Sequence, residues 1–189
     1  GETVPHLVTV LGPAGIGKTR LAQEFAAAVE EMGGRTVHGR SLPYRESGAY
    51  GALAGQIMQI ADVFESDPPA TIEAKLRATA TAVVGGTETD PDSVAEDLAA
   101  VLGVGGGGHA ADRNALFYSV REFFEGAARQ QPTILVFEDI HWADGNLLDV
   151  VLASASLMRR VPLMILTLAR PELGDQRPNW GSGLPEFLT

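Results

Sequence analysis

The stretch with the clearest chemistry is residues 12–19, which read GPAGIGKT. This fits the pattern G-x-x-x-x-G-K-[ST], the phosphate-binding P-loop. Its glycines let backbone N–H groups turn toward phosphate oxygens, and the helix that follows adds the partial positive charge of its N-terminus. We expect Lys18 to reach the β- and γ-phosphates and the Thr19 hydroxyl to ligate Mg²⁺. The predicted nucleotide-binding residues are Gly12, Pro13, Ala14, Gly15, Ile16, Gly17, Lys18, Thr19 and Arg20.

Two acids after an apolar run form a second candidate group. The sequence ILVFED at 134–139 ends in Glu138 and Asp139, which is the Walker B pattern. One carboxylate there is expected to hold Mg²⁺, and its neighbour to position or deprotonate the attacking water. We assign Glu138 to Mg²⁺ and Asp139 to the water. The common order is Asp then Glu, so the opposite assignment stays open, as does a strand that simply ends in two solvated acids.

Arg170 is the third catalytic candidate, because it follows a predicted strand at 163–168. In P-loop ATPases of the additional-strand type, that strand lies between the P-loop strand and the Walker B strand. Its C-terminal end therefore faces the γ-phosphate, where an arginine can stabilise phosphate charge. A solvated loop arginine is the alternative. Thr167 is a weaker polar candidate on the same strand.

The histidines near these motifs are candidates for metal ligands, but their spacing argues against this role. His38 has no ligand partner nearby in the sequence, and His141 has no second histidine at metal-ligand spacing. We therefore predict His38 as an ordinary strand residue and no metal role for His141. Trp142 is predicted to pack the turn beneath the site.

The elements that position these groups alternate between strand and helix. Apolar runs predict strands at 6–11, 133–137 and 163–168, and a shorter strand is expected at 35–40. Helical periodicity predicts helices at 19–32, 49–64, 71–84, 91–102, 114–129 and 146–158. In the first helix, Leu21, Phe25, Ala28, Val29 and Met32 lie at helical spacing and are expected on the packed face. Asp90 and Asp144 are predicted N-caps. The glycine run at 105–108 is expected to be a surface loop.

This alternation predicts an α/β fold. We expect the three-layer P-loop NTPase fold of the additional-strand type: a mostly parallel sheet, helices on both faces and a truncated last strand. Residues 1–189 would form a single domain excised from a larger protein, with a mainly helical insertion at about 45–130.

Composition narrows the class further. The 189 residues are 45% hydrophobic and 20% charged, which is typical of a globular domain. The absence of cysteine excludes disulfides, thiolate metal sites and cysteine nucleophiles, and agrees with a cytoplasmic location. A net charge of −10 argues against direct nucleic-acid binding. No apolar run approaches the roughly 20 residues that span a membrane, so no membrane contact is expected.

Taken together, the motifs resemble the STAND signalling ATPases. The segments GPAGIGKTRL, GRSLPY, ILVFEDIHWAD, LARPEL and RPNWGSG are similar to the AAA-like module of bacterial adenylate/guanylate cyclase-type proteins and LuxR-type transcription regulators. The resemblance covers most of the chain, from about Leu7 to Gly183. It places Lys18 and Thr19 on Walker A, Glu138 and Asp139 on Walker B, and Arg170 on the sensor arginine. The family more often has Asp where this chain has Glu138.

The resemblance implies a nucleotide-dependent switch, in which ATP binding favours an open, often oligomeric state and slow hydrolysis resets it. The implied ligands are ATP (or ADP) and Mg²⁺. The implied partners are other domains of the parent chain and, through nucleotide-dependent self-association, further copies. Two other functions stay open: a nucleotide-gated scaffold with negligible turnover, and a P-loop kinase for a small molecule, with the helical insertion as its lid.

Overall fold

Strands and helices alternate along the computed structural model, which describes residues 6–43, 50–104, 113–158, 161–184 and 187–188. The strands are β1 (His6–Leu11), β2 (Arg35–Arg40), β3 (Thr133–Glu138), β4 (Leu163–Ala169) and β5 (Phe187–Leu188). The helices are α1 (Lys18–Glu31), α2 (Gly51–Ile60), α3 (Pro69–Val84), α4 (Pro91–Val101), α5 (Arg113–Gln130), α6 (Gly145–Leu157) and α7 (Glu172–Gln176), with a 3₁₀ turn η1 (Ile140–Trp142). Each predicted helix and strand is present, with small shifts at the ends.

The strands form one five-stranded sheet in the order β2-β3-β4-β1-β5, and every pairing is parallel. β4 lies between β1 and β3, so the predicted additional-strand arrangement and the α/β fold are confirmed. The short β5 is the only strand of the described sheet that the sequence analysis did not place as a separate run. Parallel pairing brings the C-terminal ends of the strands to one edge, which is where open α/β sheets bind ligands.

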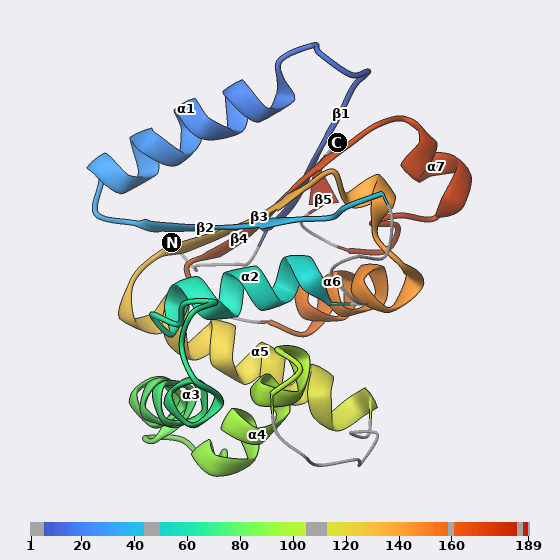
Figure 1. Cartoon of the computed structure of the whole chain (residues 1–189). Coiled ribbons are helices and arrows are strands. Elements are labelled where there is room, and N and C mark those ends of the chain that lie inside the picture. Colours follow the sequence, from blue (N-terminus) through green and yellow to red (C-terminus); the bar gives the residue numbers. More distant parts are fainter. Residues whose placement is uncertain (1–5, 44–49, 105–112, 159–160, 185–186, 189) are drawn as a thin grey trace.

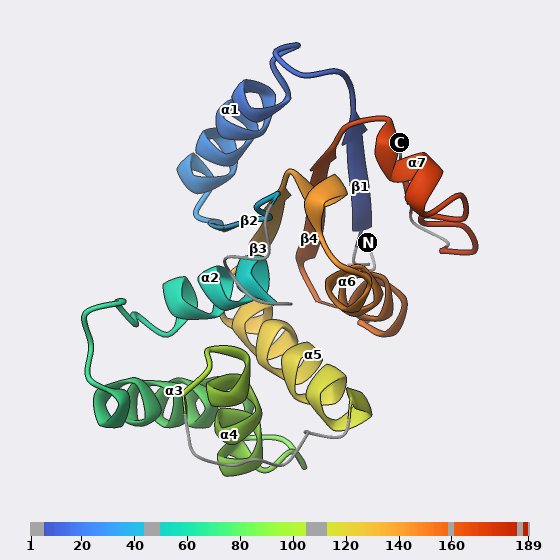
Figure 2. The same ribbon diagram turned by 45° about the vertical axis from the view of Figure 1, so that its right-hand side comes forward.

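Helices cover both faces of the sheet. Figure 1 shows α1 above the sheet, with α2, α5 and α6 below it. Figure 2 shows α3 and α4 packed beyond α5, away from the sheet. The larger core lies on the side of α2, α5 and α6. The smaller core lies under α1 and contains Ala22, Ile134, Val136, Leu166 and Leu168.

The ends of several helices follow from single residues. Asp90 caps α4 by accepting hydrogen bonds from the N–H groups of Asp92 and Ser93, and Asp144 caps α6 by accepting one from Leu147. Both predicted N-caps are therefore confirmed. Gly39 lets α2 approach β2 closely, because a Cβ at this position would lie 2.0 Å from the Ala52 carbonyl oxygen.

The packed face of α1 differs from the prediction. Leu21, Phe25, Ala28 and Met32 are exposed, whereas Ala22 and Ala26 are buried against the sheet. Of the predicted stripe, only Val29 packs partly against the smaller core. The two stripes are adjacent on the helix, and the small alanines let the helix backbone lie close to the strands. The helix predicted at 49–64 ends earlier, at Ile60, and Phe64 beyond it is exposed. The glycine run at 105–108 lies outside the described residues.

Candidate functional site

The candidate residues meet at the C-terminal edge of the sheet. β1 leads into the P-loop, β3 ends at Glu138, and β4 ends one residue before Arg170. The strand register places Leu11 beside Ala169. The first P-loop residue continues this pairing, because the Gly12 N–H donates to the Ala169 carbonyl oxygen over 3.2 Å.

The P-loop turns through glycine conformations and delivers the start of α1. Gly15 and Gly17 have φ values of 78° and 104°, in the left-handed region that favours glycine. Gly17 is the N-cap of α1, so the N–H groups of Lys18, Thr19 and Arg20 lie in the first turn, where the helix supplies no acceptor. The Lys18 ammonium donates to the carbonyl oxygens of Gly12 (2.7 Å) and Pro13 (3.0 Å).

Each of the two acids contacts a basic side chain of β2. Glu138 Oε1 lies 3.4 Å from His38 Nδ1. Asp139 Oδ2 accepts two hydrogen bonds from Arg40, at 3.0 Å from Nε and 2.8 Å from Nη2. Asp139 also has a φ of 53°, which is uncommon for residues other than glycine, although Asn, Asp and His adopt it more often than the rest. The acids are thus held in place by the neighbouring strand.

β2 contributes two side chains to the site that the sequence motifs do not reveal. His38 lies on a strand as predicted, but it also faces Glu138, and Arg40 was not singled out. The signal that could have found Arg40 is the strand order: once β2 is placed beside β3, a basic residue at its C-terminal end must lie next to the Walker B acids.

Arg170 lies beside the turn that follows the acids. Its backbone N–H donates to His141 Nδ1 over 3.3 Å, and its guanidinium carbon lies 5.8 Å from the centre of the Trp142 ring. The Trp142 side chain is exposed. It therefore supports Arg170 at the surface instead of packing beneath the site, which corrects the prediction.

Thr167 does not join the other candidates. It is fully buried, and its hydroxyl lies 2.8 Å from the Thr9 hydroxyl, which also accepts a hydrogen bond from the Trp180 indole. Its neighbours Leu166 and Leu168 point toward α1, so Thr167 points into the opposite face of the sheet. Its role is to fix β1 to β4 inside the core.

Comparison with known sequences identifies the family of this chain. The model of the AAA ATPase domain matches residues 1–166. The chain belongs to this family. It is also 24% identical over 191 aligned positions to an uncharacterized protein of Rhizobium meliloti (strain 1021), which covers 90% of the chain and 17% of that protein. The chain therefore spans about a sixth of this relative's length.

AAA ATPase domains generally bind ATP together with Mg²⁺. This AAA ATPase domain has oxygen donors of the right kind in Thr19, Glu138 and Asp139. Within the described residues, no group of three or more His, Cys, Asp or Glu side chains gathers as a metal site. The set of Thr19, Glu138 and Asp139 fits Mg²⁺, which usually takes one or two carboxylates and completes its shell with phosphate oxygens and water.

The pKa of His141 in this AAA ATPase domain depends on its burial and on nearby charges. Burial lowers the pKa of His141 below its ordinary value. The charges of Asp139 and Glu172 oppose this shift, and those of Arg170 and Lys18 add to it. In the part of the chain that the structure describes, no helix is both long and apolar enough to cross a bilayer.

Proposed function

We propose that this AAA ATPase domain is an ATP-binding, slowly hydrolysing regulatory switch of the STAND type, within a bacterial multidomain signalling protein. The observation that carries the proposal is the meeting of the P-loop, the Glu138–Asp139 pair and Arg170 at one edge of the sheet. A P-loop alone indicates phosphate binding. Acids and an arginine at the same edge add the groups that hydrolysis requires.

Each residue then has a separate task. The P-loop backbone and Lys18 bind the phosphates. Thr19 and Glu138 would hold Mg²⁺, which supplies neutralisation of phosphate charge when bound. Asp139 orients or deprotonates the attacking water, and Arg170 stabilises the charge that develops on the γ-phosphate.

Slow turnover agrees with the contacts of Asp139. Its carboxylate oxygen Oδ2 already accepts two hydrogen bonds from Arg40. A carboxylate restrained in this way is less able to follow and deprotonate a water. The same observation favours the second candidate function, a nucleotide-gated scaffold with negligible hydrolysis.

The regulatory part of the proposal rests on the larger context. The chain covers only 17% of its Rhizobium meliloti relative. We infer that other domains of a longer polypeptide respond to the nucleotide state, in a cyclase-type or LuxR-type regulator, and that nucleotide promotes self-association. Cytoplasmic location belongs to the same proposal.

Two measurements, nucleotide binding and then phosphate release, test the proposed function. Mg·ATP is titrated into the wild type and Lys18→Ala, and phosphate release is then followed under saturating Mg·ATP. The switch requires binding that depends on Lys18, together with slow release above background. Tight binding without release would favour the scaffold, and unchanged affinity in Lys18→Ala would contradict both.

A further inference from the structure

A single peptide group connects the P-loop to the turn after the acids. The Ala169 carbonyl oxygen accepts the hydrogen bond from Gly12, at 3.2 Å. The N–H of the same peptide belongs to Arg170 and donates to His141 Nδ1, at 3.3 Å. The two polar groups of a trans peptide point in opposite directions. The peptide therefore lies between the P-loop on one side and His141 on the other.

The contact defines the state of the His141 ring. Because Nδ1 accepts a hydrogen bond, a neutral ring carries its proton on Nε2. The residue is only 3% exposed. Nε2 is buried and has no hydrogen-bond partner among the residues that the structure describes. Buried donors without a partner are uncommon and costly, and such a group in a native site calls for a functional reason.

The backbone of His141 is tied to the same region. Gln176, at the end of α7, donates its side-chain amide N–H to the His141 carbonyl oxygen over 3.2 Å. The centre of the neighbouring Trp142 ring lies 4.9 Å from the centre of the imidazole. The same Trp142 ring also contacts the Arg170 guanidinium. Arg170 is thus held through its backbone by His141 and through its side chain by Trp142.

We propose that His141 is a positioning residue, whose imidazole holds the Ala169–Arg170 peptide and so fixes Arg170 and the entry of the P-loop relative to Asp139. This inference rests on the proposed function, because Arg170 is assigned there to the γ-phosphate. His141 itself touches neither nucleotide nor metal in this role. Its removal therefore affects turnover more than nucleotide affinity.

Two substitutions separate the acceptor from the volume of the ring. His141→Asn retains an acceptor oxygen near the position of Nδ1, whereas His141→Leu fills similar space with no acceptor. We expect His141→Leu to lower kcat by about 10-fold to 100-fold, as a misplaced catalytic group does, with the dissociation constant of Mg·ATP changed by less than about threefold. His141→Asn should recover most of the wild-type kcat. A purely structural role would not distinguish the two variants in kcat per folded molecule.

Amide hydrogen exchange gives a second measurement that needs no nucleotide. The Arg170 amide should be protected in the wild type and in His141→Asn, and exchange faster in His141→Leu. Rapid exchange of this amide in the wild type would contradict the inference. If His141→Leu does not fold, the exchange rates of the Arg170 amide in the wild type and His141→Asn still test the inference. If wild-type turnover is too slow to measure, the exchange rates of all three proteins do so.

The outcomes also separate this inference from the proposed function. Wild-type chain that binds no Mg·ATP would overturn both. Lys18-dependent binding and turnover, with His141→Leu as fast as the wild type, would overturn the positioning role alone. Equal loss of kcat in the Asn and Leu variants would do the same, because the acceptor would then not matter.

Discussion

At the scale of single residues, the resting arrangement of the site is set by contacts from β2 to the two acids: His38 with Glu138 and Arg40 with Asp139. Asp139 Oδ2 is bonded twice by Arg40, and the backbone of Asp139 adopts a left-handed conformation. Unusual backbone conformations concentrate at functional sites, where the surroundings hold them in place. The contact between Arg40 and Asp139 is therefore the most direct control on the carboxylate proposed to act on water.

Replacement of Arg40 should release Asp139. In Arg40→Met we expect faster phosphate release in a single turnover, because the carboxylate is free to orient water. Stability should fall by less than about 1 kcal/mol, because the ion pair is largely exposed to solvent. Stopped-flow phosphate release and urea unfolding measure the two effects.

Arg77→Met is the matched control for Arg40→Met. Arg77 pairs with Asp92 at 2.8 Å between α3 and α4, also near the surface. Arg77→Met should leave the rate of phosphate release unchanged. A lower rate in Arg40→Met would show that the arginine assists Asp139 instead of restraining it.

His141 should make stability depend on pH. Burial lowers the pKa of its ring from the ordinary value of 6.5. As pH falls below about 6.5, the unfolded chain takes up the proton first, so the free energy of unfolding decreases until the lower folded pKa is reached. Urea unfolding of the wild type and His141→Asn, at about pH 7.5 and about pH 5.5, measures this. The wild type should lose more stability than the variant; parallel losses would contradict the assignment.

At the scale of elements, α1 shows where periodicity misled the prediction. Leu21, Phe25 and Met32 lie at helical spacing, but the stripe with Ala22 and Ala26 faces the sheet. Helical periodicity predicted the helix correctly but, apart from Val29, predicted the wrong packed face, because the neighbouring stripe is also apolar. Close approach of a helix to a sheet selects small side chains, and the sequence pattern does not reveal which contact will be close.

The same substitution at two positions of α1 tests this packing. Ala26→Leu should destabilise the chain by about 1–3 kcal/mol, because the buried site has no room for the larger side chain. Ala28→Leu lies on the exposed side and should change stability by no more than about 0.5 kcal/mol. Thermal or urea unfolding compares them. Equal effects would place the packed face elsewhere.

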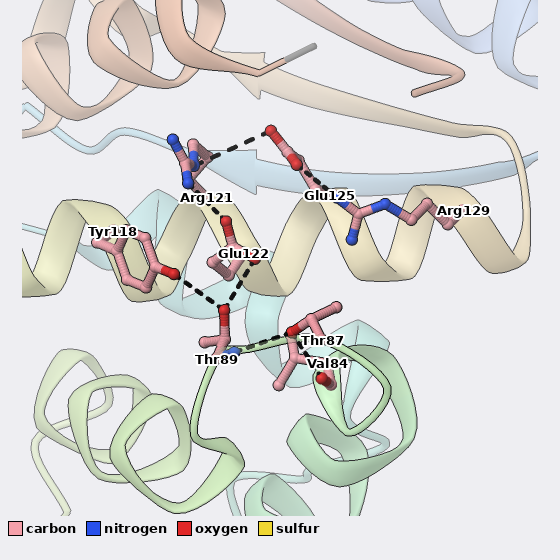
Figure 3. Close-up of polar contacts among 8 residues, drawn as sticks. All are labelled: Val84, Thr87, Thr89, Tyr118, Arg121, Glu122, Glu125 and Arg129. Carbon is pink, nitrogen blue, oxygen red and sulfur yellow. Dashed lines mark hydrogen bonds and ion pairs between the residues drawn. The ribbon is translucent and has the colours of Figure 1, made fainter. Parts of the chain in front are cut away.

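A buried polar network attaches the connection between α3 and α4 to α5 (Figure 3). The Thr89 hydroxyl donates to Glu122 Oε2 over 3.1 Å, so the Tyr118 hydroxyl, 3.0 Å away, must be the donor to Thr89. Arg121 donates to the other oxygen of Glu122 over 2.5 Å. The carboxylate is therefore bonded on both oxygens although it is almost completely buried.

Thr89→Val should weaken this attachment. The substitution keeps the shape and removes the hydroxyl, leaving Glu122 without one of its buried donors at a cost of about 1–3 kcal/mol. Thr81→Val is the control, because the Thr81 hydroxyl bonds within its own helix at an exposed position; its effect should stay within about 0.5 kcal/mol. Hydrogen exchange should locate the loss to α3 and α4. Equal destabilisation by both would argue against the network.

At the scale of the whole molecule, strand order brings together motifs that are far apart in the sequence. Placing β4 between β1 and β3 sets Arg170 beside the P-loop, and placing β2 beside β3 sets Arg40 beside Asp139. The strands and the three motifs could be predicted, because both are local patterns. The contacts of Arg40 and His141 are not local patterns, since they join residues 99 and 29 positions apart, and the contact of Arg40 follows only once β2 is placed beside β3. The packing of α3 and α4 on α5 depends likewise on contacts that helical periodicity does not specify.

The central claim is that the P-loop edge of this sheet binds Mg·ATP through Lys18. Calorimetric titration of Mg·ATP into the wild type and Lys18→Ala tests it most directly, with unfolding measurements to establish that both are folded. We predict saturable binding by the wild type that requires Mg²⁺ and is lost in Lys18→Ala. The same affinity in both proteins, or no binding by a folded wild type at any concentration, would contradict the account.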